Sequence, residues 1–156
     1  SLILLMVFSR LIPHPPNFTP IIAVAIMSSF FFKNLTFSIL VMIISMFLSD
    51  LFIGFYTNIL FVYLPLILIN FIFFNLSHKL NYKTLFLYGF SGALIFYLIS
   101  NFGVWLNGNM YEKNLYGLIN CYYLAIPFFK NTLISTFFFS YLTLWIFNLR
   151  SKILFN

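Results

Sequence analysis

Charged residues are scarce in this 156-residue chain: Asp, Glu, Lys and Arg together make up 6% of it, and only two residues are acidic. A soluble domain usually carries about a quarter charged residues. Hydrophobic residues make up 63% of the chain, which is more apolar surface than one core of this size can bury. Lipid must therefore solvate most of it, which predicts an all-α, polytopic transmembrane helix bundle.

Other scarcities exclude further classes of protein. The single cysteine, Cys121, excludes an intrachain disulfide framework. The eight Lys and Arg residues are scattered singly, so no basic cluster follows a nucleic-acid backbone. There is no Ser–His–Asp pattern, no carboxylate pair and no glycine-rich phosphate loop, so we expect neither an enzyme nor a cofactor. We expect no metal site, because His14 and His78 fall at opposite predicted membrane faces.

Apolar runs set the expected topology. About 20 apolar residues cross a bilayer, so the chain suits one domain, residues 1–156, with about six crossings. The run 118–129 is expected to be interfacial or re-entrant. The first run is too short to span alone, and an alternative makes the first two runs half-helices around a re-entrant loop. The runs cover 2–12, 21–32, 36–55, 58–76, 84–102, 118–129 and 132–149.

The positive charges favour a cytoplasmic N-terminus. In that orientation five basic residues lie at inner ends and three at outer ends. The same orientation gathers most other polar residues at the outer end of the bundle. We expect them to form a polar site there. The gathered residues are Arg10, His14, Asn17, Asp50, Asn101, Asn107, Glu112, Asn120 and Lys130.

Asp50 has apolar neighbours on both sides. A carboxylate in such a place is costly unless it is paired or hydrated. Its expected partner is Arg10, which is predicted at the same depth. Three readings stay open: a structural ion pair that fixes two helices, a carboxylate that faces a ligand or coupling ion, and a simple interfacial position.

The segment Pro13–Pro20 contains four prolines and is therefore stiff. A non-helical segment at membrane depth is tolerated only when it is buried in protein or lines a watery cavity. His14 and Asn17 would be held there in fixed directions. The segment is either a plug that seals helix ends or a lid that contacts a substrate.

Aromatic residues surround the last outer loop, including Trp105, Tyr122 and Tyr123. They form either an interfacial belt or a stack against a flat ligand. Cys121 lies in the same stretch. A lone cysteine in an apolar segment usually behaves as a small, buried, apolar side chain.

Four motifs resemble an uncharacterised bacterial family of small integral membrane proteins catalogued under transport. The motifs are Arg10-Leu-Ile-Pro-His-Pro-Pro-Asn-Phe-Thr-Pro-Ile, Leu48-Ser-Asp-Leu-Phe-Ile-Gly-Phe, Ser100-Asn-Phe-Gly-Val-Trp-Leu and Gly117-Leu-Ile-Asn-Cys-Tyr-Tyr-Leu-Ala-Ile-Pro-Phe-Phe-Lys-Asn-Thr. The family is likened to the substrate-binding S components of energy-coupling-factor (ECF) transporters, and the match covers nearly the whole chain.

The resemblance implies a six-helix bundle in the bacterial cytoplasmic (inner) membrane. Its pocket would open outward under the loop between the first two helices. S components dock on a membrane scaffold driven by two ATPases, using small residues of the first helix. Here the first run has only Ser9 as a small residue, while the second has four, Ala23, Ala25, Ser28 and Ser29.

We therefore expect an S-component-like subunit that captures a small, vitamin-like molecule for uptake. The expected partners are the lipid bilayer, that ligand, and an ECF-type scaffold with its ATPases or other membrane subunits. The alternatives are a structural accessory subunit of a larger membrane complex and, with less support, a membrane enzyme using His14, Asp50 and Cys121. The expected ligand-binding residues are Arg10, His14, Asn17, Asp50, Asn101, Trp105, Asn120, Cys121 and Tyr122.

Overall fold

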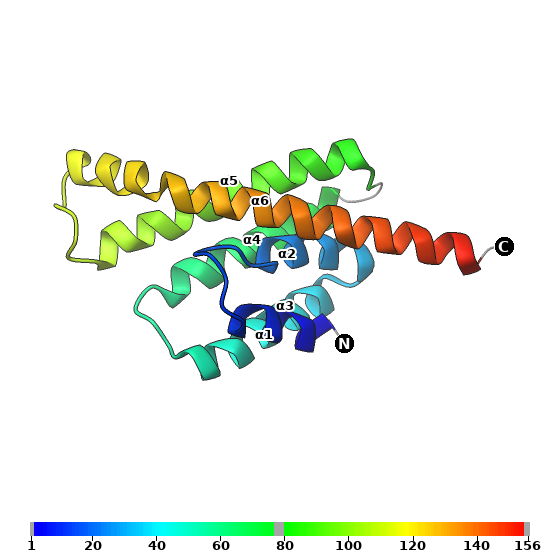
Figure 1. The fold of residues 1–156 in the computed structure, drawn as a ribbon. Helices are drawn as coiled ribbons and strands as arrows, with labels where there is room; N and C mark the ends of the chain where they lie inside the picture. The colour runs from blue at the N-terminus through cyan, green and yellow to red at the C-terminus, as the bar shows by residue number, and fades with distance from the viewer. Residues whose placement is uncertain (1, 77–79, 155–156) are drawn as a thin grey trace.

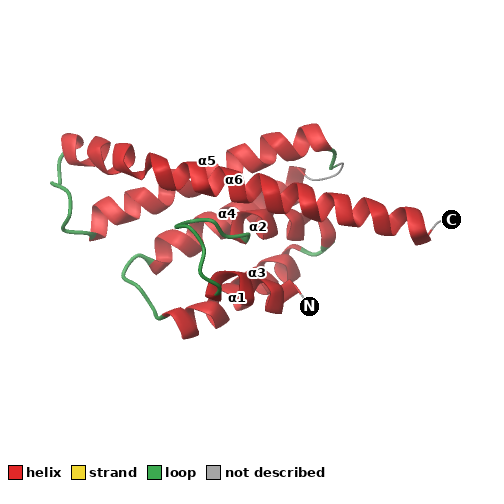
Figure 2. Ribbon diagram, in the orientation of Figure 1, coloured by secondary structure: helices red, strands yellow, loops and turns green. Residues whose placement is uncertain are grey.

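The described parts of the chain, residues 2–76 and 80–154 of a computed structural model, contain only helices and loops (Figures 1 and 2). This confirms the all-helical class. His78 lies outside the described residues. The helices are α1 (Leu2–Leu11), α2 (Ile21–Phe31), α3 (Leu35–Ile53), α4 (Ile59–Leu76), α5 (Tyr82–Asn107) and α6 (Leu115–Leu154).

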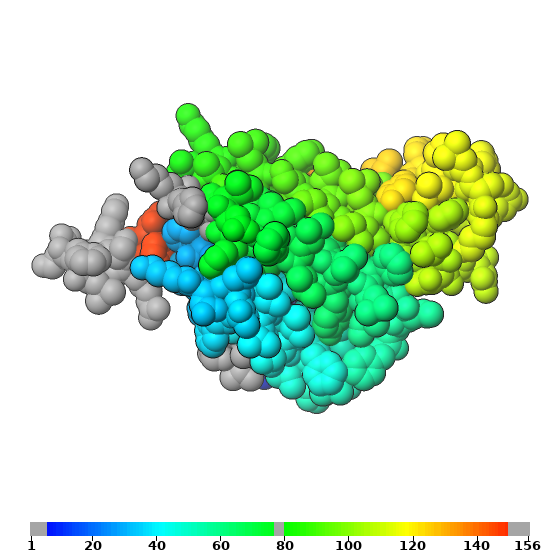
Figure 3. Space-filling view, turned by 180° about the vertical axis from the view of Figure 1, so that it is seen from behind, coloured from blue at the N-terminus to red at the C-terminus, as the bar shows by residue number. Residues whose placement is uncertain are grey.

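Four helices in the described ranges are long and apolar enough to cross a membrane: α3, α4, α5 and the part Ile126–Leu149 of α6. The chain is therefore an integral membrane protein. Large apolar side chains remain exposed on these helices, where lipid would cover them. Helices α3, α4 and α5 form much of the face seen in Figure 3.

The expectation of six crossings is not met. Helices α1 and α2 have 10 and 11 residues, and each would rise only about 15–17 Å. The expected separation of the runs 118–129 and 132–149 is wrong as well, because a single helix, α6, runs unbroken for 40 residues through both of them and through Pro127. The polar pair Lys130–Asn131 suggested a helix end. Instead Lys130 is exposed, and Asn131 donates a hydrogen bond to the carbonyl of Pro16.

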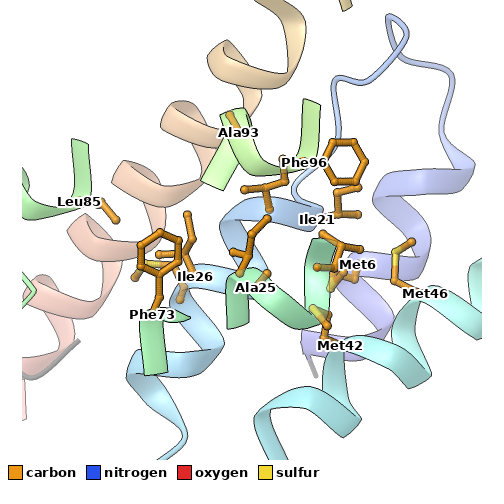
Figure 4. Packing of buried hydrophobic residues seen from close by; sticks show 14 of the residues in the cluster. Met6, Ile21, Ala25, Ile26, Met42, Met46, Phe73, Leu85, Ala93 and Phe96 are labelled. Atoms are coloured by element: carbon orange, nitrogen blue, oxygen red, sulfur yellow. The ribbon is translucent and has the colours of Figure 1, made fainter. Parts of the chain in front are cut away.

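Helix α2 lies at the centre of the bundle and contacts α3, α4, α5 and α6, while α1 packs on α3 (Figure 1). A helix that is apolar on every side is a buried helix. Most side chains of α2 are buried, and Figure 4 shows Ile21, Ala25 and Ile26 among side chains of the surrounding helices. Its short length therefore reflects enclosure by protein and not a full crossing.

Glycine at position 92 permits the close approach of α5 to α2. A Cβ atom there would lie 3.2 Å from Ile22 and 3.3 Å from Ile26. Gly89 and Ala93 are buried beside it, whereas Ser91 is exposed. The small residues of this part of α5 therefore pack against protein, except for Ser91.

A buried amide joins three helices. Asn70 of α4 is fully buried, and its Nδ2 lies 3.2 Å from the Ala25 carbonyl, 3.0 Å from the Ser28 hydroxyl and 2.9 Å from the Ser38 hydroxyl. Inside a bilayer these groups have no water to bond instead. The amide therefore fixes α2, α3 and α4 relative to one another.

We expect Asn70→Ala to lower the free energy of unfolding by about 1–3 kcal/mol, because it leaves buried polar groups without their donor. The measurement is equilibrium unfolding in mixed micelles with increasing SDS. Asn75→Ala is the matched control, because Asn75 is exposed and bonds only to Phe71 of its own helix. Equal losses in the two variants would contradict the role of Asn70.

Candidate functional site

A buried ion pair lies at the end of the bundle where α1 and α3 finish. Nη2 of Arg10 is 2.7 Å from Oδ1 of Asp50, and the two side chains are 11% and 0% exposed. Oδ2 of Asp50 accepts a hydrogen bond from the hydroxyl of Tyr63 at 2.7 Å. Nη1 of Arg10 donates to the carbonyl of Met46 at 3.2 Å and to the Ser49 hydroxyl. The predicted ion pair between Asp50 and Arg10 is therefore confirmed.

Both carboxylate oxygens of Asp50 are engaged by protein groups, and each charge of the pair neutralises the other. Of the three readings of Asp50, this geometry favours the structural ion pair. The pair joins α1 to α3, and Tyr63 extends the connection to α4. A ligand would meet the guanidinium of Arg10 and not the carboxylate.

The proline-rich segment between α1 and α2 lies against the apolar part of α6. Asn131 donates to the carbonyl of Pro16 at 3.0 Å, and the rings of Phe18 and Phe139 are 6.0 Å apart. Asn17 has a positive φ of 62°, a conformation that Asn tolerates better than most residues. The segment therefore packs against the part of α6 that is long and apolar enough to cross a membrane.

Two adjoining cavities lie beside this segment. The first, of about 410 Å³, lies between the segment and the α5–α6 hairpin, and we call it the hairpin cavity. The second, of about 400 Å³, lies against Arg10 and His14, and we call it the Arg10 cavity. They share the lining residues Asn17, Tyr56, Val62 and Phe96. Binding pockets for small molecules have volumes of about 300–1,000 Å³, so either cavity has the size of such a pocket.

Five of the nine residues expected from the sequence line these cavities. Arg10 and His14 line the Arg10 cavity, Asn101 and Cys121 line the hairpin cavity, and Asn17 lines both. Nδ1 of His14 lies 3.0 Å from the carbonyl of Pro15, which makes this nitrogen the donor.

The other four expected residues are not among those that line the two cavities. Besides Asp50 they are Trp105, Asn120 and Tyr122. Nε1 of Trp105 donates to the carbonyl of Glu112 at 2.9 Å, and the hydroxyl of Tyr122 donates to the carbonyl of Leu98 at 2.7 Å. Both side chains therefore fasten the α5–α6 hairpin that forms one wall of the hairpin cavity.

Cys121 is buried, and its Sγ lies 3.5 Å from the carbonyl of Asn101. Burial raises the pKa of the Cys121 thiol, against the lowering effect of Lys113. The thiol is therefore uncharged at neutral pH and contributes a small, weakly polar surface to the hairpin cavity.

Tyr56 was missed by the sequence reasoning and lines both cavities. Burial and then the charge of Asp50 raise the pKa of its phenol to about 12, although Arg10 opposes them. The phenol keeps its proton at physiological pH and can donate a hydrogen bond. Tyr56 lies in the loop between α3 and α4, beside the ion pair of Arg10 and Asp50. Because Arg10 is distant in the sequence, no local pattern indicated that Tyr56 belongs to the site.

Asn58, Phe96 and Ser100 were also missed, and all three line the hairpin cavity. Ser100 could have been found from Asn101, which it precedes at the same helix end. Phe96 could not, because it is one of 24 phenylalanines in an apolar chain. Within the described ranges, no three His, Cys, Asp or Glu side chains come close enough to hold a metal ion.

One protein-family model matches residues 1–154, and its description is a family of unknown function (DUF6580). The chain belongs to this family. No curated protein and no solved structure matches the chain. Membership of this family covers nearly the whole sequence but assigns no activity to it. The function of this family member is therefore argued from the two cavities and their walls.

A double-mutant cycle tests the ion pair. We expect Arg10→Leu and Asp50→Leu each to cost about 3–5 kcal/mol of unfolding free energy, because each leaves one buried charge unpaired. The double variant should lose much less than the sum of the two. Unfolding in SDS micelles gives the three values, and additive losses would show that the two charges do not interact.

Proposed function

We propose that this family member is the substrate-capturing subunit of an uptake system for a small, vitamin-like molecule. The observation that supports it is the pair of adjoining cavities at one end of the bundle. Apolar walls with a few convergent polar groups are typical of small-molecule sites. Here the apolar walls include Phe96 and Val62, and the polar groups include Asn17, Asn101 and Tyr56.

In this proposal the segment Pro13–Pro20 is the lid. It lines both cavities, and its contacts with α6 are a single amide hydrogen bond from Asn131, a long one from Ser135 at 3.5 Å and a ring contact. Two hydrogen bonds and one ring contact with α6 must break for it to lift. The stiffness given by its prolines favours movement as a unit about its ends, where it joins α1 and α2.

The four sequence motifs resemble a family that is likened to ECF S components, and this resemblance favours the same role, with a scaffold and two ATPases as partners. The small residues used for docking are the weak point of this analogy. In this chain they lie on α2, where Ala23, Ala25, Ser28 and Ser29 are all buried within the bundle. Docking on a scaffold would therefore use another surface, or the subunit would work without one.

We expect the cavities to open to the outside of the bacterial inner membrane, with the N-terminus cytoplasmic. In a Cys121→Ser background, Asn109→Cys in the α5–α6 loop should react with a membrane-impermeant maleimide in intact spheroplasts. Lys83→Cys, exposed at the start of α5, should react only after permeabilisation. The reverse pattern would place the cavities on the cytoplasmic side.

Native mass spectrometry of protein extracted gently from its own membrane tests the capture itself. We expect a bound mass of a few hundred daltons that is lost in Asn101→Ala, which removes a lining amide. Asn107→Ala is the matched control, because Asn107 is exposed on the same helix and is not among the lining residues. Protein subunits that co-migrate without any small molecule would instead identify an accessory subunit of a larger complex.

A further inference from the structure

The Arg10–Asp50 ion pair presents only its positive member to the Arg10 cavity. Arg10 is 11% exposed and lines this cavity, whereas Asp50 is 0% exposed and is not among the lining residues of either cavity. The described residues that line the two cavities include no Asp or Glu. A group bound on the cavity side therefore lies nearer to the guanidinium than to the carboxylate. Because Coulomb energy falls with distance, the attraction of a negative group exceeds its repulsion.

Arg10 has donors to spare for such a group. A guanidinium carries five N–H groups. Nη1 donates to the Met46 carbonyl and to the Ser49 hydroxyl, and Nη2 gives one N–H to Asp50. These three bonds to α3 hold the guanidinium in one orientation. They leave the Nε–H and the second N–H of Nη2 for other acceptors near the cavity.

Tyr56 supplies a second donor beside Arg10, and it lines both cavities. Burial and then Asp50 raise the pKa of its phenol to about 12, while Arg10 opposes them by its charge and by a hydrogen bond. A guanidinium can only donate, so the phenol oxygen is the acceptor in that contact. The phenol keeps its own proton at physiological pH, and that proton is left to donate to a ligand.

From these contacts we propose that the site binds a largely apolar molecule that ends in a carboxylate. One carboxylate oxygen accepts an N–H of Arg10 and the other accepts the hydroxyl proton of Tyr56. Such bonds between charged groups are stronger than bonds between neutral ones. Val62 and Phe96, which line both cavities, cover the apolar body. This inference rests on the proposed function, since it names the class of molecule that is captured.

Three probes of one shape test the selection: 2-naphthoate is an anion, 2-naphthamide is uncharged, and 2-(aminomethyl)naphthalene is a cation. The readout is the Tm of the purified full chain in detergent, because a bound molecule stabilises the folded state. We expect 2-naphthoate to raise the Tm by about 3 °C, the amide by less than half as much, and the amine not at all. Equal shifts, a larger shift with the amide or the amine, or no shift with any probe would overturn the proposed ligand class.

Tyr56→Phe tests the hydroxyl, because it removes one oxygen and keeps the ring. The Tm shift with 2-naphthoate should fall to less than half of its value in the unchanged protein. Tyr116→Phe is the matched control, since Tyr116 is exposed at the start of α6 and is not among the residues that line the cavities. It should keep the full shift. An equal shift in the two variants would overturn the role of Tyr56.

The double variant Arg10→Leu/Asp50→Leu tests the guanidinium. It removes both charges together, so neither is left buried and unpaired. In this variant 2-naphthoate should raise the Tm no more than 2-naphthamide does, because the lining then has no permanent counter-charge for the anion. A preference for 2-naphthoate that persists would overturn the role of Arg10. Tyr56→Phe decides the question if the double variant does not fold.

The molecule released from the native extract separates this inference from the proposed function. We expect it to gain the mass of an added amine when it is treated with a carbodiimide and that amine, as a carboxylate does. A bound molecule that does not react in this way would reject the inference alone. Absence of both a bound molecule and any probe-induced Tm shift would reject the proposed function as well.

Discussion

The ion pair between Arg10 and Asp50 is the interaction on which the arrangement of the polar end depends. Neither charge could stay in an apolar bundle alone, so α1 and α3 must keep their relative positions. Tyr63 holds the second oxygen of Asp50 and brings α4 into the same unit. The Arg10 cavity lies against this unit, which gives the candidate site one rigid wall.

The opposite wall has a different construction. The α5–α6 hairpin is held by Tyr97 and Tyr122, whose hydroxyls donate to carbonyls of the facing helix at 2.6 and 2.7 Å. Gly103 brings α5 so close to α4 that a Cβ atom there would meet the ring of Phe61. With both walls fixed, the proline-rich segment between them is held to α6 by two hydrogen bonds and one ring contact. That contrast is why we assign movement to the segment and recognition to the walls.

The sequence was enough for the class of protein, because apolar composition alone decides whether lipid is the solvent. It was also enough for the Arg10–Asp50 pair, since a buried acid needs a partner and few were present. It misjudged α2, because an apolar run has the same appearance whether it meets lipid or protein. It misjudged α6, because the polar pair Lys130–Asn131 suggested a helix end. It missed Asn58 and Tyr56 as residues that line the cavities. Their place in the lining depends on segments that are distant in the sequence and not on their neighbours in the chain.

The length of α6 has a consequence for how a solute would reach the site. Its 40 residues correspond to about 60 Å, roughly twice the thickness of the hydrocarbon layer. If Ile126–Leu149 occupies that layer, the first turns of α6, with Cys121, rise into the headgroup region. The hairpin cavity then begins among the headgroups, and the Arg10 cavity continues it toward the bilayer interior. A weakly polar solute would concentrate at that boundary first and enter sideways from it, so its partitioning into membranes would set the rate of capture.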